Sequence, residues 1–465
     1  MFNFNPNLNL INLSILITIL SSLIQFSSAA IAELDQIYYG VWLDTDVGYQ
    51  DTPILYNTRL GRNASVFHIA QNMPLTPYNY TTGAGGPAPE YVIENTATDA
   101  AVFITVYPTA LTVLSDNDFT VLDQSDFNRT VFLRWAPEMQ GRWNPYGQLP
   151  VLFVQSWQAM YKGIKAIAPA TVVVWAPNLG SGYPFGQTAD IAAEDLAVLD
   201  TNKNGQLDAG DDPYAPYYPG DDYVDWIGLS VYFKQFSVNT NLAQPAGFCS
   251  DILTGINSQT GHTTTVNWYD TYCTQKPSKA CLIAESGAAY HPNINTGTAT
   301  QLQIQQAWWQ DCITNTTFMD RFPRLRLHMH FEYEKMEADI GAPDLRDYRL
   351  TNVSEVLTAF QNDLNTVQDR YHWAQYRVPT QPIKTTGPGV SAPKTATLAV
   401  PTLVLQTLRN PLATGLPTLF GTRAASDAWK VTVPIGISAL SCISSGVYFI
   451  GVGRARALRA RRSID

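Results

Sequence analysis

Short apolar runs rich in β-branched and aromatic residues recur along most of the chain. They occupy residues 38–43, 66–69, 101–107, 131–135, 171–175, 224–231, 281–284 and 325–331. Each run is apolar almost throughout instead of alternating with polar residues, which is typical of strands buried on both faces of a parallel sheet. Helical patterns separate several runs, for example at residues 151–167 and 301–313. Strands that alternate with helices in this way predict an α/β fold, a (β/α)8 TIM barrel, although a doubly wound sheet has similar local patterning.

Two further apolar segments flank this region. Residues 10–24 are apolar and are followed by small residues at 27–30, where a signal peptidase can cut, so residues 1–30 are predicted to be a signal peptide. Residues 431–453 carry no charge, and this length can cross a hydrocarbon core of about 30 Å as a helix. Arginines follow throughout residues 454–465, and positive residues stay on the cytoplasmic side of a membrane. We therefore predict a transmembrane helix with a basic cytoplasmic tail.

This topology predicts a single-pass protein of the secretory pathway, with its main domain outside the cell at the cell surface. A lipid-anchored or secreted protein is the alternative, because the small residues Ala424, Ala425 and Ser426 precede the apolar segment. Pro, Thr, Ala and Gly dominate residues 377–430, which predicts a low-complexity stalk. One globular body is therefore expected over residues 33–376.

Two features of this body agree with a lumenal location. Asn-X-Ser/Thr triplets predict N-glycosylation at Asn63, Asn79, Asn128, Asn315 and Asn352. The body contains an even number of cysteines, and we expect them to form disulfides in an oxidising compartment. They are Cys249, Cys273, Cys281 and Cys312. Three connectivities are open to them, and proximity in sequence favours the pairs 249–273 and 281–312.

The composition narrows the class of ligand. Charged residues make up 15% of the chain, and it contains 11 Trp and 24 Tyr, which suits a protein that stacks aromatic faces on neutral ligands. The net charge of -10 argues against a nucleic-acid-binding role, because no basic stripe is present to neutralise phosphates.

Two glutamates follow predicted strands where the active site of a barrel is expected. Glu138 follows the fourth run in VFLRWAPEMQGRWNPYGQ, and Glu285 ends the seventh in CLIAESGAAY. Barrel enzymes carry their catalytic groups at the C-terminal ends of strands, and glycoside hydrolysis requires two carboxyl groups flanking the scissile bond. Surface loops are the ordinary place for glutamates. A sugar site is nevertheless favoured by the nearby aromatic residues, which are Trp135, Trp143, Tyr146 and Trp175.

These motifs resemble glycoside hydrolase family 26, a clan A family of retaining β-mannanases, and most closely its fungal secreted members. RWAPEMQGRW looks like the family's acid/base motif and IAESGAAY looks like its nucleophile motif. The resemblance implies that Glu138 is the general acid/base and that Glu285 is the nucleophile. GLSVY resembles the segment whose tyrosine hydrogen-bonds the nucleophile, which implies this role for Tyr232.

The resemblance covers roughly residues 39–350 and implies further substrate-binding positions. Arg134 matches the arginine beside the acid/base, and WAPN matches family sequence that places Trp175 and Asn178 near the substrate. The aromatic residues of the acid/base motif and of the end of the eighth strand complete the substrate-binding residues that we expect. The full set is Arg134, Trp135, Trp143, Trp175, Asn178, Tyr232 and Phe331.

The chain departs from the family pattern at three places. Pro137 replaces the histidine that precedes the acid/base glutamate and helps to orient the sugar, which leaves the specificity for mannan open. Phe331 occupies the position of an aromatic platform that is often Trp. Only 23 residues separate Tyr107 from Val131, so the third helix of the barrel is expected to be short or in part missing.

A separate motif, DTNKNGQLDAGD, fits an EF-hand-like Ca²⁺ loop. The expected ligands at positions 1, 3, 5, 7, 9 and 12 are Asp200, Asn202, Asn204, Gln206 (through its carbonyl), Asp208 and Asp211. Gly205 takes the sharp turn at position 6, while Asp at position 12 replaces the usual Glu. A polar Asx-rich turn is the alternative. A single loop of this kind predicts a structural ion.

The sequence therefore predicts a retaining, endo-acting glycoside hydrolase that cleaves a β-linked polysaccharide, β-mannan-like or mixed β-glucan, by double displacement without a catalytic cofactor. Two alternatives remain: a catalytically silent glycan-binding or cell-wall adhesion protein on a barrel scaffold, and a cell-wall transglycosylase. The expected partners are the polysaccharide and, through the C-terminal helix, a membrane. The oligomeric state is left open.

Overall fold

A computed structural model describes residues 36–44, 51–74, 91–111, 129–186, 188–234, 240–264, 266–338 and 343–377. The predicted signal peptide, transmembrane helix, basic tail and nearly all of the stalk lie outside these ranges. The sequons at Asn79 and Asn128 and most of the segment expected to hold the third helix also lie outside them. Within the described ranges, no helix combines the length and apolar character needed to cross a membrane.

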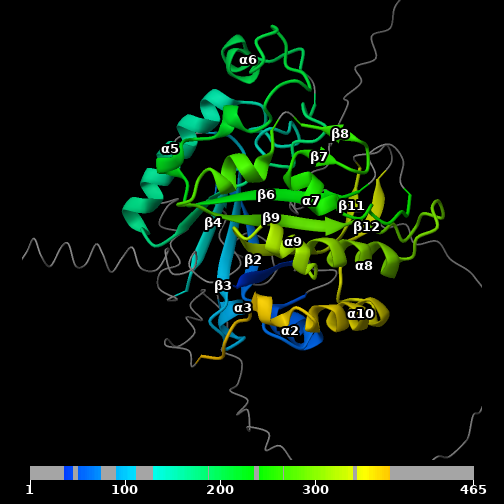
Figure 1. Ribbon diagram of the computed structural model, residues 1–465. Helices are drawn as coiled ribbons and strands as arrows, with labels where there is room; N and C mark the ends of the chain where they lie inside the picture. The colour runs from blue at the N-terminus through cyan, green and yellow to red at the C-terminus, as the bar shows by residue number, and fades with distance from the viewer. Residues whose placement is uncertain are drawn as a thin grey trace, which may run out of the picture. The chain divides into compact units, whose positions relative to one another are not determined.

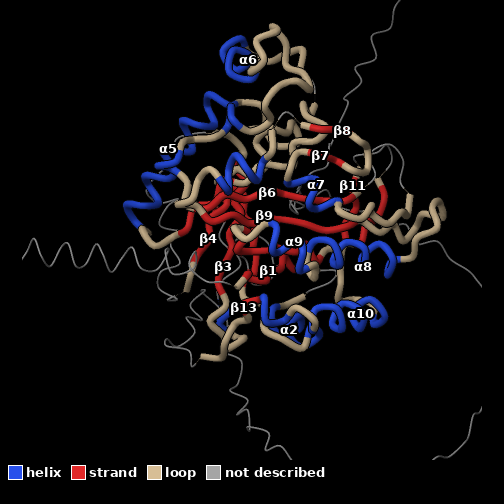
Figure 2. Tube along the Cα trace, viewed as in Figure 1, coloured by secondary structure: helices blue, strands red, loops and turns tan. Residues whose placement is uncertain are grey.

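Parallel strands form a closed barrel at the centre of the described body, shown in red in Figure 2. Neighbouring strands follow the order β10-β9-β6-β5-β4-β3-β2-β1, and β10 pairs back onto β1. The bounds are β1 Ile37–Leu43, β2 Val66–Met73, β3 Ala101–Pro108, β4 Val131–Trp135, β5 Val172–Trp175, β6 Trp226–Phe233, β9 Ala280–Ala288 and β10 Leu325–Glu332. Each strand overlaps one of the predicted runs, so the predicted eight-stranded TIM barrel is confirmed. The short β13 (Tyr371–His372) adds to β1.

Helices surround the barrel (Figure 1). The longest described helix is α5 (Pro150–Ile167), whose buried residues Phe153, Trp157, Met160 and Ile164 recur at helical spacing and form one apolar face. Pro150 at its start has the fixed φ that suits the first turn. α8 (Gln301–Cys312) begins with a capping box between Thr300 and Gln303. Both helices match their predicted positions.

The remaining elements are shorter. They are α2 Pro53–Leu60, α3 Tyr91–Glu94, α6 Ala193–Leu199, α7 Phe248–Leu253, α9 Thr316–Arg321, α10 Ser354–Asn365, β7 Ile256–Asn257, β8 His262–Thr263, β11 Glu334–Glu337, β12 Asp344–Asp347, the 3-10 turns η2 Ala215–Tyr217, η3 Asp221–Tyr223 and η5 Gln368–Arg370, and the π-helical turn η4 Tyr269–Thr274. In Figure 1, α10 lies beside α2, and Gln361 Nε2 donates to the carbonyl of Arg59 at 2.9 Å. This contact joins the first and last helices of the described body.

The apolar residues form two separate cores, as the alternation of side chains along a strand requires. The barrel interior contains Phe132, Val174, Leu282 and Met329 together with other inward residues. A larger core lies between the strands and the helices and contains Leu133, Trp157 and Ile283. The interior core fills the barrel below the strand ends that carry the site.

The cysteine pairing differs from the prediction. All four cysteines form disulfides, but the pairs are Cys249–Cys312 and Cys273–Cys281, with Cα atoms 5.6 and 5.9 Å apart. Packing explains the difference, because Cys249 in α7 meets the end of α8 across 63 residues of sequence, whereas the turn η4 lies against the start of β9. The pairing that was inferred from proximity in sequence is therefore wrong.

Three predicted sequons fall within the described residues. Asn63 donates its Nδ2 to the carbonyl of Ala374 at 3.3 Å, and Asn352 donates its Nδ2 to Asp347 at 3.0 Å. Asn315 instead uses Oδ1 to cap α9, accepting from Phe318 N at 3.1 Å. Glycosylation at these three positions stays a prediction. A glycan attaches to Nδ2, and of the three side chains only Asn315 does not use this atom in the hydrogen bond described.

Candidate active site

Glu285 lies near the C-terminal end of β9 with both carboxylate oxygens engaged. Arg134 Nη1, from β4, donates to Oε2 at 2.5 Å, and the Tyr232 hydroxyl, from β6, donates to Oε1 at 2.7 Å. The side chains of Arg134 and Glu285 are both fully buried. Removal from water strengthens this attraction, and the arginine compensates the negative charge that burial would otherwise disfavour.

An irregularity in the sheet aims Glu285 into the barrel. In β9, Leu282 and Ala284 belong to the interior core, so strict alternation would turn Glu285 outward. The pairing between β6 and β9 shifts at this point, because Leu229 pairs with Ile283 but Ser230 pairs with Glu285. Ala284 is the extra residue, and such a β-bulge re-aims the side chain that follows it. The bulge is what brings Glu285 to Arg134.

Glu138 lies just beyond the end of β4, in a turn of unusual backbone. Its φ is 55°, in the left-handed region that a non-glycine residue adopts at a cost of about 1–2 kcal/mol. The backbone N–H of Glu138 donates to the carbonyl of Ala176 at 3.0 Å. The carbonyl of the preceding Pro137 accepts from Asn144 Nδ2 at 3.1 Å and from the Tyr146 hydroxyl at 2.8 Å. These bonds fix the turn.

Glu138 is buried, with 2% of the residue exposed, and its carboxyl group lies within the electrostatic influence of Glu285. Burial raises its pKa, the negative charge of Glu285 raises it further, and Arg134 lowers it in part. Trp143 Nε1 donates to Oε2 at 2.9 Å, whereas Oε1 is buried without a hydrogen-bond partner among the described residues. Glu138 is thus the carboxyl group that favours the protonated state, beside an ion-paired Glu285.

The predicted substrate-binding residues fall into two groups. Phe331 packs near Tyr232, with ring centroids 5.8 Å apart, and the backbone of Asn178 exchanges hydrogen bonds with the side chain of Gln140. Trp143 contacts Glu138 as described. Arg134, Tyr232 and Trp143 thus bond the two carboxyl groups, whereas Phe331 packs on Tyr232 and Asn178 is held by Gln140.

Trp135 and Trp175 do not belong to this site, which corrects the prediction. Both are last residues of their strands and are fully buried in the core between strands and helices. Trp135 packs against Trp157 of α5 at 6.0 Å, and the Trp175 indole donates to the carbonyl of Tyr217 at 3.0 Å. Side chains alternate along a strand, and the inward Arg134 therefore fixes Trp135 as outward.

Two residues at the site were not predicted. Ser230 accepts from Arg134 Nη2 at 2.7 Å and is fully buried. It precedes Tyr232 by two residues on the same strand, so the period of two could have identified it. Tyr348 packs against Tyr232 with ring centroids 5.5 Å apart, but it follows β12 outside the barrel, where no strand period applies.

The predicted Ca²⁺ loop forms one compact turn between α6 and η2. Asp200 accepts from the backbone N–H groups of Asn204 and Gly205, and Asp211 accepts from those of Thr201, Asn202 and Asp208. Side chains of Asn202 and Asn204 donate to Asp208, while Gln206 is exposed. Gly205 has a φ of 89°, as the sharp turn requires. All six predicted ligand residues therefore lie in one turn.

Among all the described residues, including the loop from Asp200 to Asp211, one group of His, Cys, Asp and Glu side chains has metal-ligating geometry, formed by Cys249, Asp311 and Cys312. Its two cysteines are joined in a disulfide, and Asp311 accepts from the backbone N–H groups of Gly247 and Cys249. The two sulfur atoms and the carboxylate thus hold α7 against α8 instead of forming a metal site.

Comparisons with known proteins give partial similarities. No family model matches the chain. A β-1,3-xylanase TXYA from Vibrio and a β-1,3-xylanase from Alcaligenes are each 28% identical to it over 118 residues. The aligned segment is 25% of this chain and 20% of each relative, so the chain spans about a fifth of the length of the curated relatives that it matches.

Similar solved structures are also glycoside hydrolases. A modular endo-β-1,4-mannanase from Cellulomonas fimi aligns with 77% of this chain and 79% of its own at 12% identity and a TM-score of 0.45. The family 26 domain of a mannanase/glucanase from Prevotella bryantii aligns with 72% of this chain and 91% of its own, at 13% identity and a TM-score of 0.40. The chain is thus similar to family 26 mannanases and to β-1,3-xylanases, and its barrel is established by its own strand order.

Proposed function

We propose that this chain is a retaining, endo-acting glycoside hydrolase of the family 26 type that cleaves a β-linked polysaccharide. The observation that carries the proposal is the pair of buried glutamates at the ends of the fourth and seventh barrel strands. Burial and the negative charge of Glu285 raise the pKa of Glu138, while the positive charge of Arg134 balances the charge of Glu285 in a buried ion pair. A proton donor beside an ionised nucleophile is the arrangement that double displacement requires.

In the first step, Glu285 attacks the anomeric carbon while Glu138 donates its proton to the departing glycosidic oxygen. The C–O bond to the leaving sugar breaks as the bond from Glu285 forms, which gives a glycosyl-enzyme. Loss of the Glu285 charge lowers the pKa of Glu138, because the charge of Glu285 is one cause of its elevation. Glu138 then removes a proton from water, which attacks the anomeric carbon and releases Glu285.

Reducing ends released from polysaccharides test this proposal. The full chain and the Glu285→Gln variant are incubated with β-mannan, glucomannan, lichenan, β-1,3-xylan and β-1,3-glucan. Glu332→Gln is the matched control, since Glu332 is another fully buried glutamate but bonds Leu350 and Thr351 outside the carboxylate pair. Activity in the wild type and in Glu332→Gln, with loss in Glu285→Gln, supports the proposal. A folded wild type that cleaves none of the polymers contradicts it.

One observation favours a second candidate, a glycan-binding protein without catalysis. Glu138 and Glu285 are 2% and 0% exposed, so a polysaccharide reaches them only if the surrounding residues move. Arg134, Tyr232 and Trp143 nevertheless bond the two carboxyl groups at defined atoms, an arrangement that simple glycan binding does not require. Binding of a polymer without new reducing ends would favour this candidate.

We further propose that the loop from Asp200 to Asp211 binds a structural Ca²⁺. Support comes from the spacing of its oxygen-bearing residues and from the turn at Gly205. The residues fit a hard cation that prefers oxygen ligands. Such an ion would order the connection between β5 and β6 and would take no part in the chemistry.

The anchoring of the enzyme is likewise a proposal. An uncharged segment at residues 431–453, followed by arginines, supports a single membrane span with the barrel outside the cell. Alkaline carbonate extraction tests it: the protein is expected in the membrane pellet. Release by a phospholipase would instead establish a lipid anchor.

A further inference from the structure

Backbone pairing between β9 and β10, whose register shifts between Leu325 and Leu327, ends just before Glu285. The pairs are Cys281 with Leu325, Leu282 with Leu327 and Ile283 with His328. In the described part of these strands no backbone pair follows, although β9 continues to Ala288 and β10 to Glu332. The bulge at Ala284 thus coincides with the loss of the ladder on the other side of β9. Glu285 and Ser286 therefore keep backbone pairing with Ser230 and Val231 of β6 but have none with β10.

Ser286 supplies side-chain bonds where the ladder stops. Its Oγ lies 2.9 Å from the carbonyl of Met329 and 3.0 Å from His328 Nε2. A hydroxyl has one proton, and a carbonyl can only accept, so Ser286 donates to Met329 and accepts from His328. Burial, together with the neighbouring His330, lowers the pKa of His328 to about 3, which keeps its ring neutral with the proton on Nε2.

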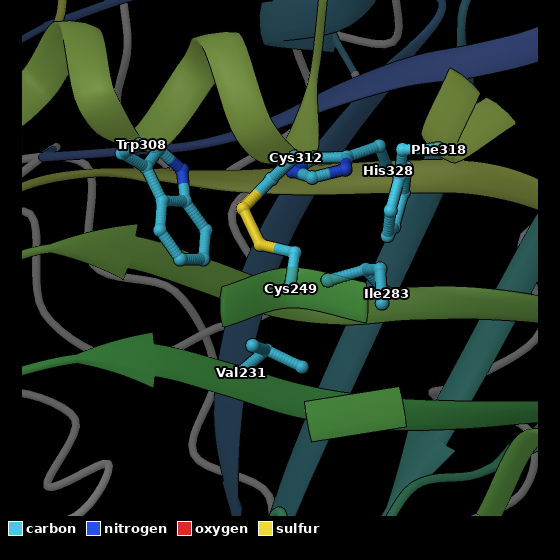
Figure 3. A pocket seen from close by; sticks show the side chains of 7 residues that line it. All are labelled: Val231, Cys249, Ile283, Trp308, Cys312, Phe318 and His328. Carbon is cyan, nitrogen blue, oxygen red and sulfur yellow. A yellow bond between two sulfur atoms is a disulfide. The ribbon is translucent and has the colours of Figure 1, made fainter. Parts of the chain in front are cut away.

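His328 is buried on the outer face of the barrel. Figure 3 shows its ring at a small cavity that is also lined by Val231, Ile283 and Phe318 and by the Cys249–Cys312 disulfide. Val231 precedes Tyr232, and Ile283 precedes the bulge. The disulfide ties α7 to α8 over this face. The side chains around the cavity and the disulfide thus keep His328 and its bond to Ser286 away from solvent.

We propose that Ser286 and His328 form an inter-strand clamp that positions Glu285 for nucleophilic attack. Ser286 directly follows Glu285, so a bond that fixes its side chain to β10 also fixes the preceding carboxylate against Tyr232 and Arg134. Neither residue touches the reacting atoms; both are positioning residues. The inference rests on the proposed hydrolase function.

The chain offers a matched control at the opposite end of the barrel. Ser65, just before β2, accepts from the Tyr39 backbone N–H at 2.9 Å and donates to the Tyr39 carbonyl at 3.0 Å. It is buried like Ser286 and bonds a neighbouring strand in the same way. Ser65→Ala therefore reproduces the loss of a buried serine hydroxyl without approaching the carboxylates.

Kinetics on the full chain test the clamp. Ser286→Ala and His328→Leu are expected to lower kcat by about 10- to 100-fold, since small misplacement of a reacting group has effects of this size, with KM little changed. His328→Gln, which keeps a nitrogen donor, is expected to recover part of kcat. Ser65→Ala is expected to match the wild type in kcat. Equal kcat in Ser286→Ala and wild type overturns the clamp while leaving the hydrolase intact.

Crystal structures of the same variants give a readout that does not depend on activity. In Ser286→Ala, the Glu285 carboxylate is expected to lose its contact with the Tyr232 hydroxyl or with Arg134, whereas Ser65→Ala keeps both. An unshifted carboxylate in Ser286→Ala overturns the clamp, whether or not kcat falls. If the wild type hydrolyses no glycan but the carboxylate shifts, the proposed function fails and the clamp stands as a structural device.

Discussion

Arg134 and Glu285 form an ion pair of 2.5 Å whose two side chains are both removed from solvent. The pair joins β4 to β9 across the barrel and leaves the second oxygen of Glu285 to the Tyr232 hydroxyl. Because Ser230 also accepts from Arg134, the guanidinium connects three strands. The residues of the site therefore also hold the barrel strands together, so substitutions of them are expected to affect stability as well as activity.

Arg134→Gln is expected to destabilise the protein strongly, because Glu285 is left buried without a counter-charge. Loss of one partner of a buried pair typically costs about 3–5 kcal/mol. Chemical denaturation of the variant measures this cost. In the double variant Arg134→Gln, Glu285→Gln most of the stability is expected to return, since no charge remains buried. Independent, additive effects of the two changes would contradict the pairing.

Trp143→Phe is expected to move the alkaline limb of the pH profile of kcat/KM to higher pH. The indole N–H donates to Glu138 and stabilises its ionised form, so it lowers the pKa of a group that must be protonated to act as the acid. Removing the donor raises that pKa further. An alkaline limb that is unchanged or shifted to lower pH would show that Glu138 is not the titrating acid.

Because the pKa of Glu332 is raised, the free energy of unfolding is expected to decline with rising pH. Burial raises its pKa to about 7, only partly offset by bonds from Leu350 and Thr351. The folded state therefore binds more protons than the unfolded state between the ordinary value of 4.5 and about 7, and stability falls as pH rises through this window. Urea unfolding across this range is expected to show a smaller decline for Glu332→Gln than for the wild type, and equal slopes would contradict the assignment.

Calcium removal is expected to lower the melting temperature. An ion that binds only the folded state stabilises it by about 2.7 kcal/mol at a concentration of 100 Kd. Calorimetry with Ca²⁺ and with EGTA measures the difference. Asp211→Asn is expected to abolish the response, whereas Glu355→Gln, which removes an exposed acid on α10, keeps it. If EGTA does not change the melting temperature of the wild type, the loop does not hold a stabilising Ca²⁺.

The sequence was informative where local patterns dictate structure. Continuous apolar runs predicted all the barrel strands, and the motifs singled out Glu138, Glu285, Arg134 and Tyr232, whose side chains lie together at the strand ends. Trp135 and Trp175 were assigned to the site from motif similarity and aromatic type, and neither distinguishes the inner from the outer face of a strand. The bulge at Ala284 and the Ser286–His328 contact depend on pairing between distant strands. The disulfide pairs likewise depend on how α7 meets α8, which no sequence spacing records.

The stereochemistry of the first product distinguishes double displacement through Glu285 from a single displacement by water. Proton NMR follows the anomeric signal of the sugar released by the wild type, before spontaneous mutarotation mixes the two forms. Attack by Glu285, followed by attack of water on the glycosyl-enzyme, inverts the anomeric carbon twice and predicts a β product from a β-linked polymer. An initial α product would mean that water attacks in a single step, and Glu285 would then not be a nucleophile.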